Sequence, residues 1–439
     1  MAPLPQVDVR CDAYGPASAQ PKMPGAVASA SDDPFFLNVW SPGADDARRP
    51  VLVWIHGGAF ALGAGSQYDG AELARRGDIV VVTLNYRLGL LGFTDLSALG
   101  VPNNRGLHDQ LAALQWVRAH IALFGGDPER VTLAGESAGA MSVALLMIAN
   151  TPQRLFHGAI VQSGALNLMH DAATAARQGQ RFLEQLPAHQ RTLAALDTLP
   201  MATLQSAAVR MSERSIGIMP AAPVYDGQLL PSDHRAACAV ETPPIPLIVG
   251  ATREEIRLFW RAGVRDKIAS RRAEVIGPAS AQLGAEHARR IEAAYPATRA
   301  GEQQLATDAN FIMPGLHFAQ RHVERGHPAW VYRFDLGGLV FGAAHAVDLT
   351  YLWPWRGPAI AALRGGPLLG ARRRLAERMQ DAWIGFVRDG APGAGWPRYT
   401  ASERATLIMD RIDRIEQDPE RERRQAWDGA DIALGAQAS

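Results

Sequence analysis

The chain has 439 residues, of which 47% are apolar and 20% charged, so it can form one large globular domain or two ordinary ones. Lys plus Arg and Asp plus Glu both total 44, which excludes the strong net charge typical of proteins that bind nucleic acid or anionic membranes. Its two cysteines, Cys11 and Cys238, exclude a disulfide scaffold and a cysteine-rich zinc site, and nothing requires them to pair.

The first residues, MAPLPQVDVRCDAYG, have neither the basic start nor the apolar core of a secretory signal, and they carry no lipidation motif. The most apolar predicted helix, 138–149, is too short to span a bilayer. We therefore expect a cytoplasmic protein, as a monomer or small homo-oligomer, with no membrane or nucleic-acid partner.

Apolar runs typical of buried strands recur along the chain, at residues 35–40, 51–55, 79–84, 131–134, 159–161, 247–249, 330–334 and 405–410. Helical spacing of apolar residues separates several of these runs, for example over 107–121 and 375–386. Alternating buried strands and helices predict an α/β fold with a mostly parallel central sheet.

This alternation is interrupted twice. Residues 166–240 are rich in Ala and Gln and poor in strands, which predicts a helical cap over one end of the sheet, and 265–325 predicts a further helical insertion. We expect a single domain over 1–439, with its core formed by 35–165 and 243–439. The charged tail segment DPERERRQAWD predicts a solvated helix.

The pentapeptide GESAG, residues 135–139, lies between a predicted strand and a predicted helix. This is the G-x-S-x-G nucleophile elbow, in which a sharp turn exposes the serine hydroxyl above the sheet. The motif alone is modest evidence, because a strand-to-helix turn rich in small residues is the simpler explanation. The strand before it and the helix after it favour a nucleophilic Ser137.

The segment VLVWIHGGAF, residues 51–60, is a buried strand followed by His56 and two glycines. An acyl-transfer enzyme needs N–H donors for the oxyanion of its tetrahedral intermediate, and a loop after an early strand supplies them in the nucleophile-elbow fold. We predict the backbone N–H groups of Gly58, Ala59 and Ala138 as these donors. His56 is expected to brace the loop.

A nucleophilic serine needs a histidine base and a carboxylate that orients it, in the chain order serine, acid, histidine. The predicted strand 247–249 leads to Glu254 and Glu255, which periodicity cannot separate. His345 follows the strand 330–334 in a glycine-rich loop, where the base is expected, whereas the other histidines after the acid lie in predicted helices or a turn.

The segments VLVWIHGGAF, VVVTLNYRLGLLGF, AGESAG, VQSGA, TREEI, WVYRFD and HAVDL occur in this order. Together they resemble the type-B carboxylesterase family, above all its bacterial para-nitrobenzyl esterases and more distantly the cholinesterases. The resemblance implies an α/β-hydrolase fold whose helical insertions form a deep gorge. It also implies the triad Ser137, Glu255 and His345, and so selects Glu255 over Glu254.

The resemblance further implies a buried structural ion pair between Arg87 and Asp109. It places Glu136 close to the site, where its charge would favour a protonated imidazole. Phe60, Leu62 and Phe259 are expected to line an apolar gorge, together with Trp353 and Trp355, although core packing is an equal alternative for each aromatic residue.

Three departures from the family pattern are visible. The segment that usually opens these proteins, ending in GIPYAxPP, is missing, so we expect an exposed sheet edge or one blunted by Pro3 and Pro5. Pro34 stands where the family has a disulfide cysteine, which agrees with a reducing compartment. Ile256 replaces a glycine after the acid, which puts the geometry of that loop in question.

The sequence thus predicts a serine hydrolase that cleaves carboxylic esters through an acyl-enzyme, with no metal or cofactor. Its substrates are expected to be uncharged small to medium aryl or alkyl esters. Carbamate or amide hydrolysis and acyl transfer could use the same site. A non-catalytic, cholinesterase-like binding protein is the alternative of another class.

Overall fold

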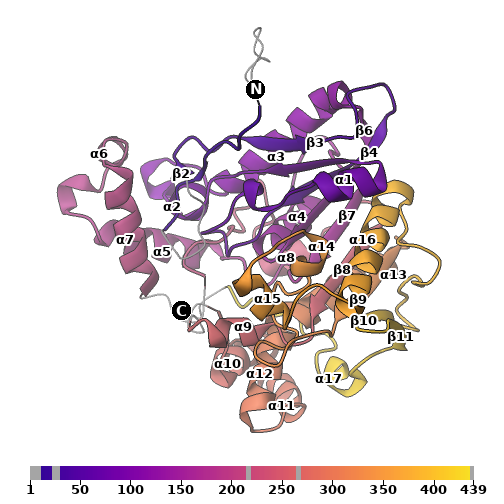
Figure 1. The fold of residues 1–439 in the computed structure, drawn as a ribbon. Helices are drawn as coiled ribbons and strands as arrows, with labels where there is room; N and C mark the ends of the chain where they lie inside the picture. Colours follow the sequence, from indigo (N-terminus) through magenta and orange to yellow (C-terminus); the bar gives the residue numbers. More distant parts are fainter. Residues whose placement is uncertain (1–10, 22–29, 214–218, 264–267, 436–439) are drawn as a thin grey trace.

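A central sheet of nine strands forms the core of the computed structural model, which describes residues 11–21, 30–213, 219–263 and 268–435 (Figure 1). Its strands run across the sheet in the order β11-β10-β9-β8-β7-β6-β4-β5-β3. In chain order they are β3 (Leu37–Trp40), β4 (Arg49–Ile55), β5 (Val80–Leu84), β6 (Gly126–Glu136), β7 (Gly158–Gln162), β8 (Leu247–Thr252), β9 (Ala329–Phe334), β10 (Ala405–Met409) and β11 (Arg414–Gln417).

The sheet is parallel from β5 to β10, and only the outermost strands, β3 and β11, pair antiparallel. Both faces of the sheet are covered. Along β4, Val51, Val53 and Ile55 enter one apolar cluster, while Leu52 and Trp54 enter another. Because successive strand residues point to opposite faces, this alternation explains why residues 51–55 of the strand are all apolar.

Helices occupy most of the connections. They are α1 (Ala71–Gly77), α2 (Gly89–Phe93), α3 (Arg105–His120), α4 (Ala138–Ile148), α5 (Ala172–Glu184), α6 (Leu193–Leu196), α7 (Met201–Glu213), α8 (His234–Ala239), α9 (Ile256–Arg261), α10 (Arg272–Leu283), α11 (Ala285–Ala293), α12 (Arg299–Thr307), α13 (Met313–Glu324), α14 (Leu349–Leu352), α15 (Pro358–Arg364), α16 (Ala371–Asp389) and α17 (Arg421–Ala426). The mostly parallel sheet flanked by helices is the α/β-hydrolase fold that the sequence predicts.

The two predicted helical regions contain helices in the structure. Between β7 and β8 lie α5 to α8, and between β8 and β9 lie α9 to α13, with α10, α11 and α12 grouped at one end of the molecule (Figure 1). A π-helical turn, Asp308–Ile312, joins α12 to α13. The division into core, cap and insertion stays a prediction.

The structure corrects one expectation about the ends of the fold and adds strands that the sequence analysis did not predict. The strand predicted at 405–410 is followed by β11, an exposed strand. Because β11 contains charged residues, a search for apolar runs does not detect it. The tail helix α17 is not fully solvated, because Arg424 and Ala426 are buried. Near the N-terminus, β1 (Ala17–Ser18) and β2 (Ala30–Ser31) form a small parallel pair, which the sequence did not indicate.

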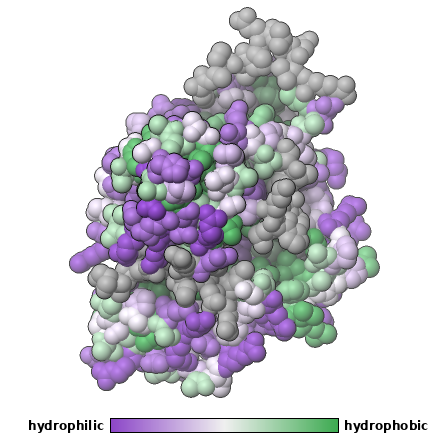
Figure 2. Space-filling view, turned by 90° about the vertical axis from the view of Figure 1, so that its left-hand side faces the viewer, coloured by the Kyte–Doolittle hydropathy of each residue, from purple (hydrophilic) through white to green (hydrophobic). Residues whose placement is uncertain are grey.

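The edge of the main sheet next to β5 is formed by β3. Pro3 and Pro5, which we expected to blunt this edge, lie outside the described residues. Neither Cys11 nor Cys238 forms a disulfide. No helix of the described part of the chain is long and apolar enough to cross a membrane. The face drawn in Figure 2 intersperses hydrophilic and hydrophobic residues.

Arg87 and Asp109 form the expected ion pair, with Arg87 Nη2 2.6 Å from Asp109 Oδ1 and Nε 2.8 Å from Oδ2. The backbone N–H of Arg87 also donates to Asp109, at 2.9 Å. The pair is only half-buried, since 29% of the Arg87 side chain is exposed against 6% for Asp109. It links the end of β5 to α3, and the expected burial holds for Asp109 but only partly for Arg87.

Candidate active site

The carboxyl ends of neighbouring parallel strands supply the candidate catalytic residues. The loop after β4 carries Gly58 and Ala59, and Ser137 follows β6 directly. Glu255 follows β8, and His345 lies in the loop after β9. Because these strands are parallel, their carboxyl ends meet at one edge of the sheet, where ligands of α/β proteins bind.

Ser137 occupies a strained turn between β6 and α4, with φ 57° and ψ −124°. A Cβ on Gly135 would lie 2.5 Å from the Gly139 carbonyl carbon, and a Cβ on Gly139 would lie 2.0 Å from the Ile55 carbonyl oxygen. The turn therefore requires both glycines. Strain of this kind persists where the surroundings enforce it, often at active sites.

His345 is held by Glu255. Its Nδ1–H donates to Glu255 Oε2 at 2.5 Å, and its backbone N–H donates to the Glu255 carbonyl at 3.3 Å. Glu255 is fully buried, and its other oxygen accepts from Ser163 Oγ and from the Thr252 N–H, both at 2.6 Å. These contacts fix the imidazole tautomer that leaves Nε2 available as a base.

The neighbouring carboxylate faces elsewhere. Glu254 accepts from Arg257 at 2.8 Å and from the Ala343 N–H at 2.9 Å, so it ties the histidine loop to α9. Ile256 is the first residue of α9 and is buried. Its backbone is helical and does not have positive φ, so this position does not require a glycine.

The other imidazole nitrogen, His345 Nε2, lies 3.2 Å from Glu136 Oε1. Burial lowers the pKa of His345, but the charges of Glu136 and Glu255 outweigh it and raise this pKa to about 9. Burial raises the pKa of Glu136 to about 8, although His345 opposes the shift. Among the described residues, no hydrogen bond joins Ser137 Oγ to Nε2.

A third carboxylate lies behind this group. Asp348 is fully buried and accepts from Gln162 Nε2 and Tyr332 OH, both at 3.0 Å. Burial raises its pKa to about 6, and the charge of Glu255 adds to the shift. His345 is thus surrounded by acidic side chains, all of which favour its protonated form.

The loop after β4 contains backbone N–H groups that have no hydrogen-bond acceptor among the described residues. Gly58, Ala59 and Phe60 all have positive φ, of 112°, 52° and 56°. The N–H groups of Gly58, Ala59 and Ala138 donate no hydrogen bond within the described part of the chain. Ala138 begins α4, so its N–H lies at the positive end of that helix.

His56 braces this loop. Its Nδ1–H donates to the Gly57 carbonyl at 2.8 Å, and its ring stacks on Tyr86 with centroids 4.4 Å apart. Tyr86 OH in turn donates to the His56 carbonyl at 2.7 Å. Burial lowers the pKa of His56 to about 4, so the ring is neutral and serves as a rigid support.

The expected substrate-lining residues differ in their exposure. Phe60 is fully buried, with its ring 4.7 Å from Phe93, so it packs beneath the loop. Leu62 and Phe259 are partly exposed, and the Phe259 ring lies 5.1 Å from His345. A further ring, Phe311 on the π-helical turn, lies 4.8 Å from His345.

The two tryptophans do not line this site. Trp353 is buried in the apolar cluster on the opposite face of the sheet from Val53, 5.0 Å from Trp54 and 5.3 Å from Tyr68. Trp355 packs on Tyr68 and donates to the Gln67 carbonyl. Trp353 therefore takes the alternative role, core packing, whereas Trp355 is only partly buried against the same cluster.

Ser163, Asp348 and Phe311 are neighbours of His345 or Glu255 that the sequence did not single out. Ser163 lies in VQSGA and Asp348 in HAVDL, so both segments were marked, but no pattern showed which side chain points inward. Phe311 follows a helical repeat like any core residue. Only the π-helical turn distinguishes it, and sequence periodicity does not reveal such a turn.

Comparison with known proteins identifies the family to which this chain belongs. A sequence profile described as the Carboxylesterase family matches residues 5–427. The chain belongs to this carboxylesterase family. It is 36% identical over 409 residues to the para-nitrobenzyl esterase of Bacillus subtilis (strain 168), covering 90% of this chain and 82% of that one. The fumonisin B1 esterase of Sphingopyxis macrogoltabida is 34% identical, with coverages of 87% and 73%.

Solved structures of carboxylesterases share the fold. A PNB esterase structure superposes with a TM-score of 0.85 at 35% identity, covering 94% of this chain and 88% of the other. A carboxylesterase of Geobacillus stearothermophilus gives 0.78 at 32% identity, with coverages of 94% and 89%. This carboxylesterase is therefore a hydrolase of carboxylic esters, and a non-catalytic binding protein is not favoured.

Proposed function

We propose that Ser137 is the nucleophile of this esterase, His345 its general base and Glu255 the acid that orients the base. The observation that carries the proposal is the 2.5 Å contact between His345 Nδ1 and the fully buried Glu255. It leaves Nε2 directed toward the residues at the elbow, since Glu136, the neighbour of Ser137, is 3.2 Å from it.

In the proposed reaction, Ser137 Oγ attacks the ester carbonyl and its proton moves to His345 Nε2. The tetrahedral intermediate collapses, the bond to the alcohol oxygen breaks, and Nε2 returns the proton to the leaving alcohol. Water then attacks the acyl-enzyme, gives its proton to Nε2, and the acid is released as Ser137 is protonated again. Imidazole contacts tighten when substrate is bound, so a serine–histidine hydrogen bond is not required beforehand.

The N–H groups of Gly58, Ala59 and Ala138 are proposed to bind the oxyanion. All three lack a hydrogen-bond partner within the described residues, and all three lie on the two turns that flank Ser137. A single donor of this kind contributes about 3 kcal/mol to transition-state stabilisation.

We propose uncharged aryl or alkyl esters of small to medium size as substrates. Phe259 gives the site partly exposed apolar surface beside His345, and the partly exposed Leu62 lies next to Gly58 in the proposed oxyanion loop. The neutral His56 adds no charge, and the surrounding carboxylates disfavour anionic substrates. The relative from B. subtilis is named for para-nitrobenzyl esters, which belong to this class. A gorge, a cytoplasmic location and the oligomeric state stay predictions.

The decisive experiment compares wild-type protein with Ser137→Ala on para-nitrophenyl esters of rising acyl length and on a nitrophenyl carbamate. We expect the variant to lose turnover while its circular dichroism spectrum stays unchanged. An organophosphate that labels active serines should add one adduct mass to the wild type and none to the variant. Hydrolysis by Ser137→Ala at the wild-type rate would contradict the proposed nucleophile.

A further inference from the structure

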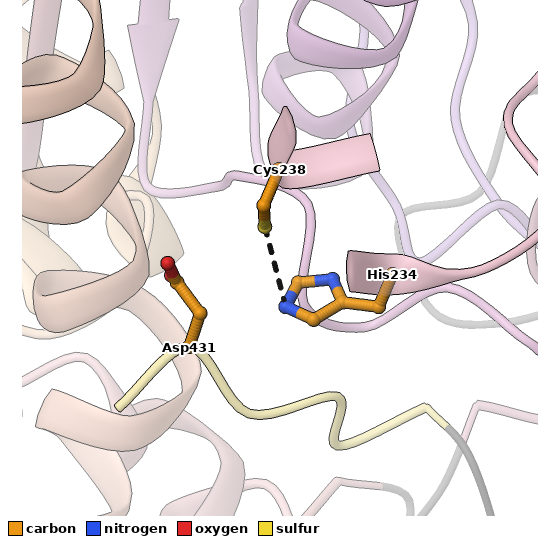
Figure 3. Close-up of side chains that lie close together, drawn as sticks. All are labelled: His234, Cys238 and Asp431. Atoms are coloured by element: carbon orange, nitrogen blue, oxygen red, sulfur yellow. Dashed lines mark hydrogen bonds between the residues drawn. The ribbon is translucent and has the colours of Figure 1, made fainter. Parts of the chain in front are cut away.

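Three potential metal ligands converge where α8 meets the C-terminal segment. His234 and Cys238 are one helical turn apart on α8, and Asp431 comes from the chain after α17 (Figure 3). One donor atom from each lies within 4.8 Å of the other two. Residues at i and i+4 share one helix face, a spacing that zinc-binding helices use.

The distance between the helix donors fits a metal. Cys238 Sγ lies 3.6 Å from His234 Nε2. In a tetrahedral zinc site, zinc–sulfur bonds of about 2.3 Å and zinc–nitrogen bonds of about 2.0–2.1 Å place these atoms about 3.6 Å apart. The observed separation, which also suits a thiol–imidazole hydrogen bond, therefore matches the spacing of two ligands in a tetrahedral zinc site.

The surroundings of His234 prepare its Nε2 as a ligand. Tyr225 OH lies 3.4 Å from His234 Nδ1 and donates its own proton to the Leu166 carbonyl at 2.6 Å. The Tyr225 oxygen is thus left to accept from Nδ1–H, which leaves the Nε2 lone pair directed at the thiol.

The other two ligands differ in charge. The Cys238 thiol must lose its proton to bind a metal as a thiolate. Asp431 is paired with Arg321 Nη1 at 2.5 Å and with His317 Nδ1 at 3.1 Å. Arg321 is therefore the cation with which a metal competes for the carboxylate.

We propose that His234, Cys238 and Asp431 form a binding site for one divalent zinc-like ion, with water as the fourth ligand. A thiolate and a carboxylate neutralise the charge of such an ion, and the mixed nitrogen, sulfur and oxygen set suits zinc. The ion would tie α8 to the C-terminal segment. No hydrogen bond or ion pair in the described residues joins these ligands to Ser137, Glu255 or His345, so the site is structural rather than catalytic.

Cobalt(II) titration of the metal-free full chain tests this proposal. We expect a thiolate-to-cobalt charge-transfer absorption that saturates at one ion per chain and disappears when Zn²⁺ is added. Cys238→Ser should abolish the band, whereas Cys11→Ser, which alters the exposed cysteine, should retain it. His234→Ala should weaken binding by at least about tenfold.

Two further measurements keep the outcome decisive. Zn²⁺ should raise the melting temperature of the wild type and of Cys11→Ser but not of Cys238→Ser, because a ligand stabilises only a fold that binds it. Arg321→Gln should bind Co²⁺ more tightly, since it removes the competing cation. A band that persists in Cys238→Ser, or weaker binding by Arg321→Gln, would overturn the proposal. Ester hydrolysis should be unchanged in Cys238→Ser.

Discussion

His345 Nε2 and Glu136 Oε1 are 3.2 Å apart, both on nearly fully buried side chains. The proposed base thus faces an acidic neighbour on the side from which it must accept a proton. Ion pairing with Glu136 favours imidazolium, which cannot act as a base. The same charge would stabilise the imidazolium that forms in the transition state, so we expect Glu136 to set the pH range of activity.

Glu136→Gln should shift the activity of the enzyme to lower pH. The base must be neutral, so kcat/KM rises with pH through the pKa of His345, which Glu136 helps to raise to about 9. Removing this charge lowers the pKa, and we expect the acid limb to move down by about one pH unit or more. The measurement is a profile of kcat/KM against pH. Glu254→Gln serves as control, and an unmoved limb in Glu136→Gln would be evidence against this role.

Glu255→Gln and Glu254→Gln form a matched pair that identifies the triad acid. Glu255 accepts from His345 Nδ1, so an amide there favours the wrong tautomer and should lower kcat by about 10⁴-fold. Glu254 contacts Arg257 and the Ala343 N–H instead, and its amide retains an acceptor, so kcat should fall by less than about tenfold. Steady-state kinetics distinguishes them, and equal losses would mean that the acid is misassigned.

Gly58→Ala should disrupt the proposed oxyanion loop. Gly58 has φ +112°, and a Cβ there would lie 2.2 Å from the Leu62 carbonyl oxygen, so the backbone must move. Displacing one donor should reduce kcat by about 10²- to 10³-fold with little effect on KM. Gly100→Ala is the control, because Gly100 also has positive φ but open space around it. Similar kcat values for the two variants would argue against the loop's catalytic role.

Asp109→Ala should destabilise the fold without changing the chemistry of the site. It leaves Arg87 without its bidentate partner and removes the acceptor of the Arg87 N–H. Because Arg87 is partly exposed, we expect the free energy of unfolding to fall by about 2 kcal/mol, which is less than for a fully buried pair. Urea unfolding measures it. The surface pair of Arg76 and Asp381 is the comparison, and Asp381→Ala should cost less than about 1 kcal/mol.

Local features made the elbow and the oxyanion loop predictable from sequence. One tight turn contains Gly135, Ser137 and Gly139, and another contains Gly57 and Gly58. Because steric contacts within each turn require the glycines, the residues of each motif lie close together in the sequence and can be recognised there. The apolar strands are equally local in origin, since a strand buried on both faces is apolar at most of its positions.

The order and spacing of these local elements determined the sheet, the elbow and the candidates Ser137 and His345. The family resemblance already favoured Glu255 over Glu254, and the contact between Glu255 and His345 Nδ1 gives the physical reason. Only the tertiary structure decided that Glu136 faces Nε2 and that Trp353 belongs to the opposite face of the sheet. Those outcomes depend on side-chain direction and on contacts between residues far apart in the chain. Hydrophobic periodicity predicts whether a residue is buried. It does not predict which residue it contacts, because tertiary packing determines that partner.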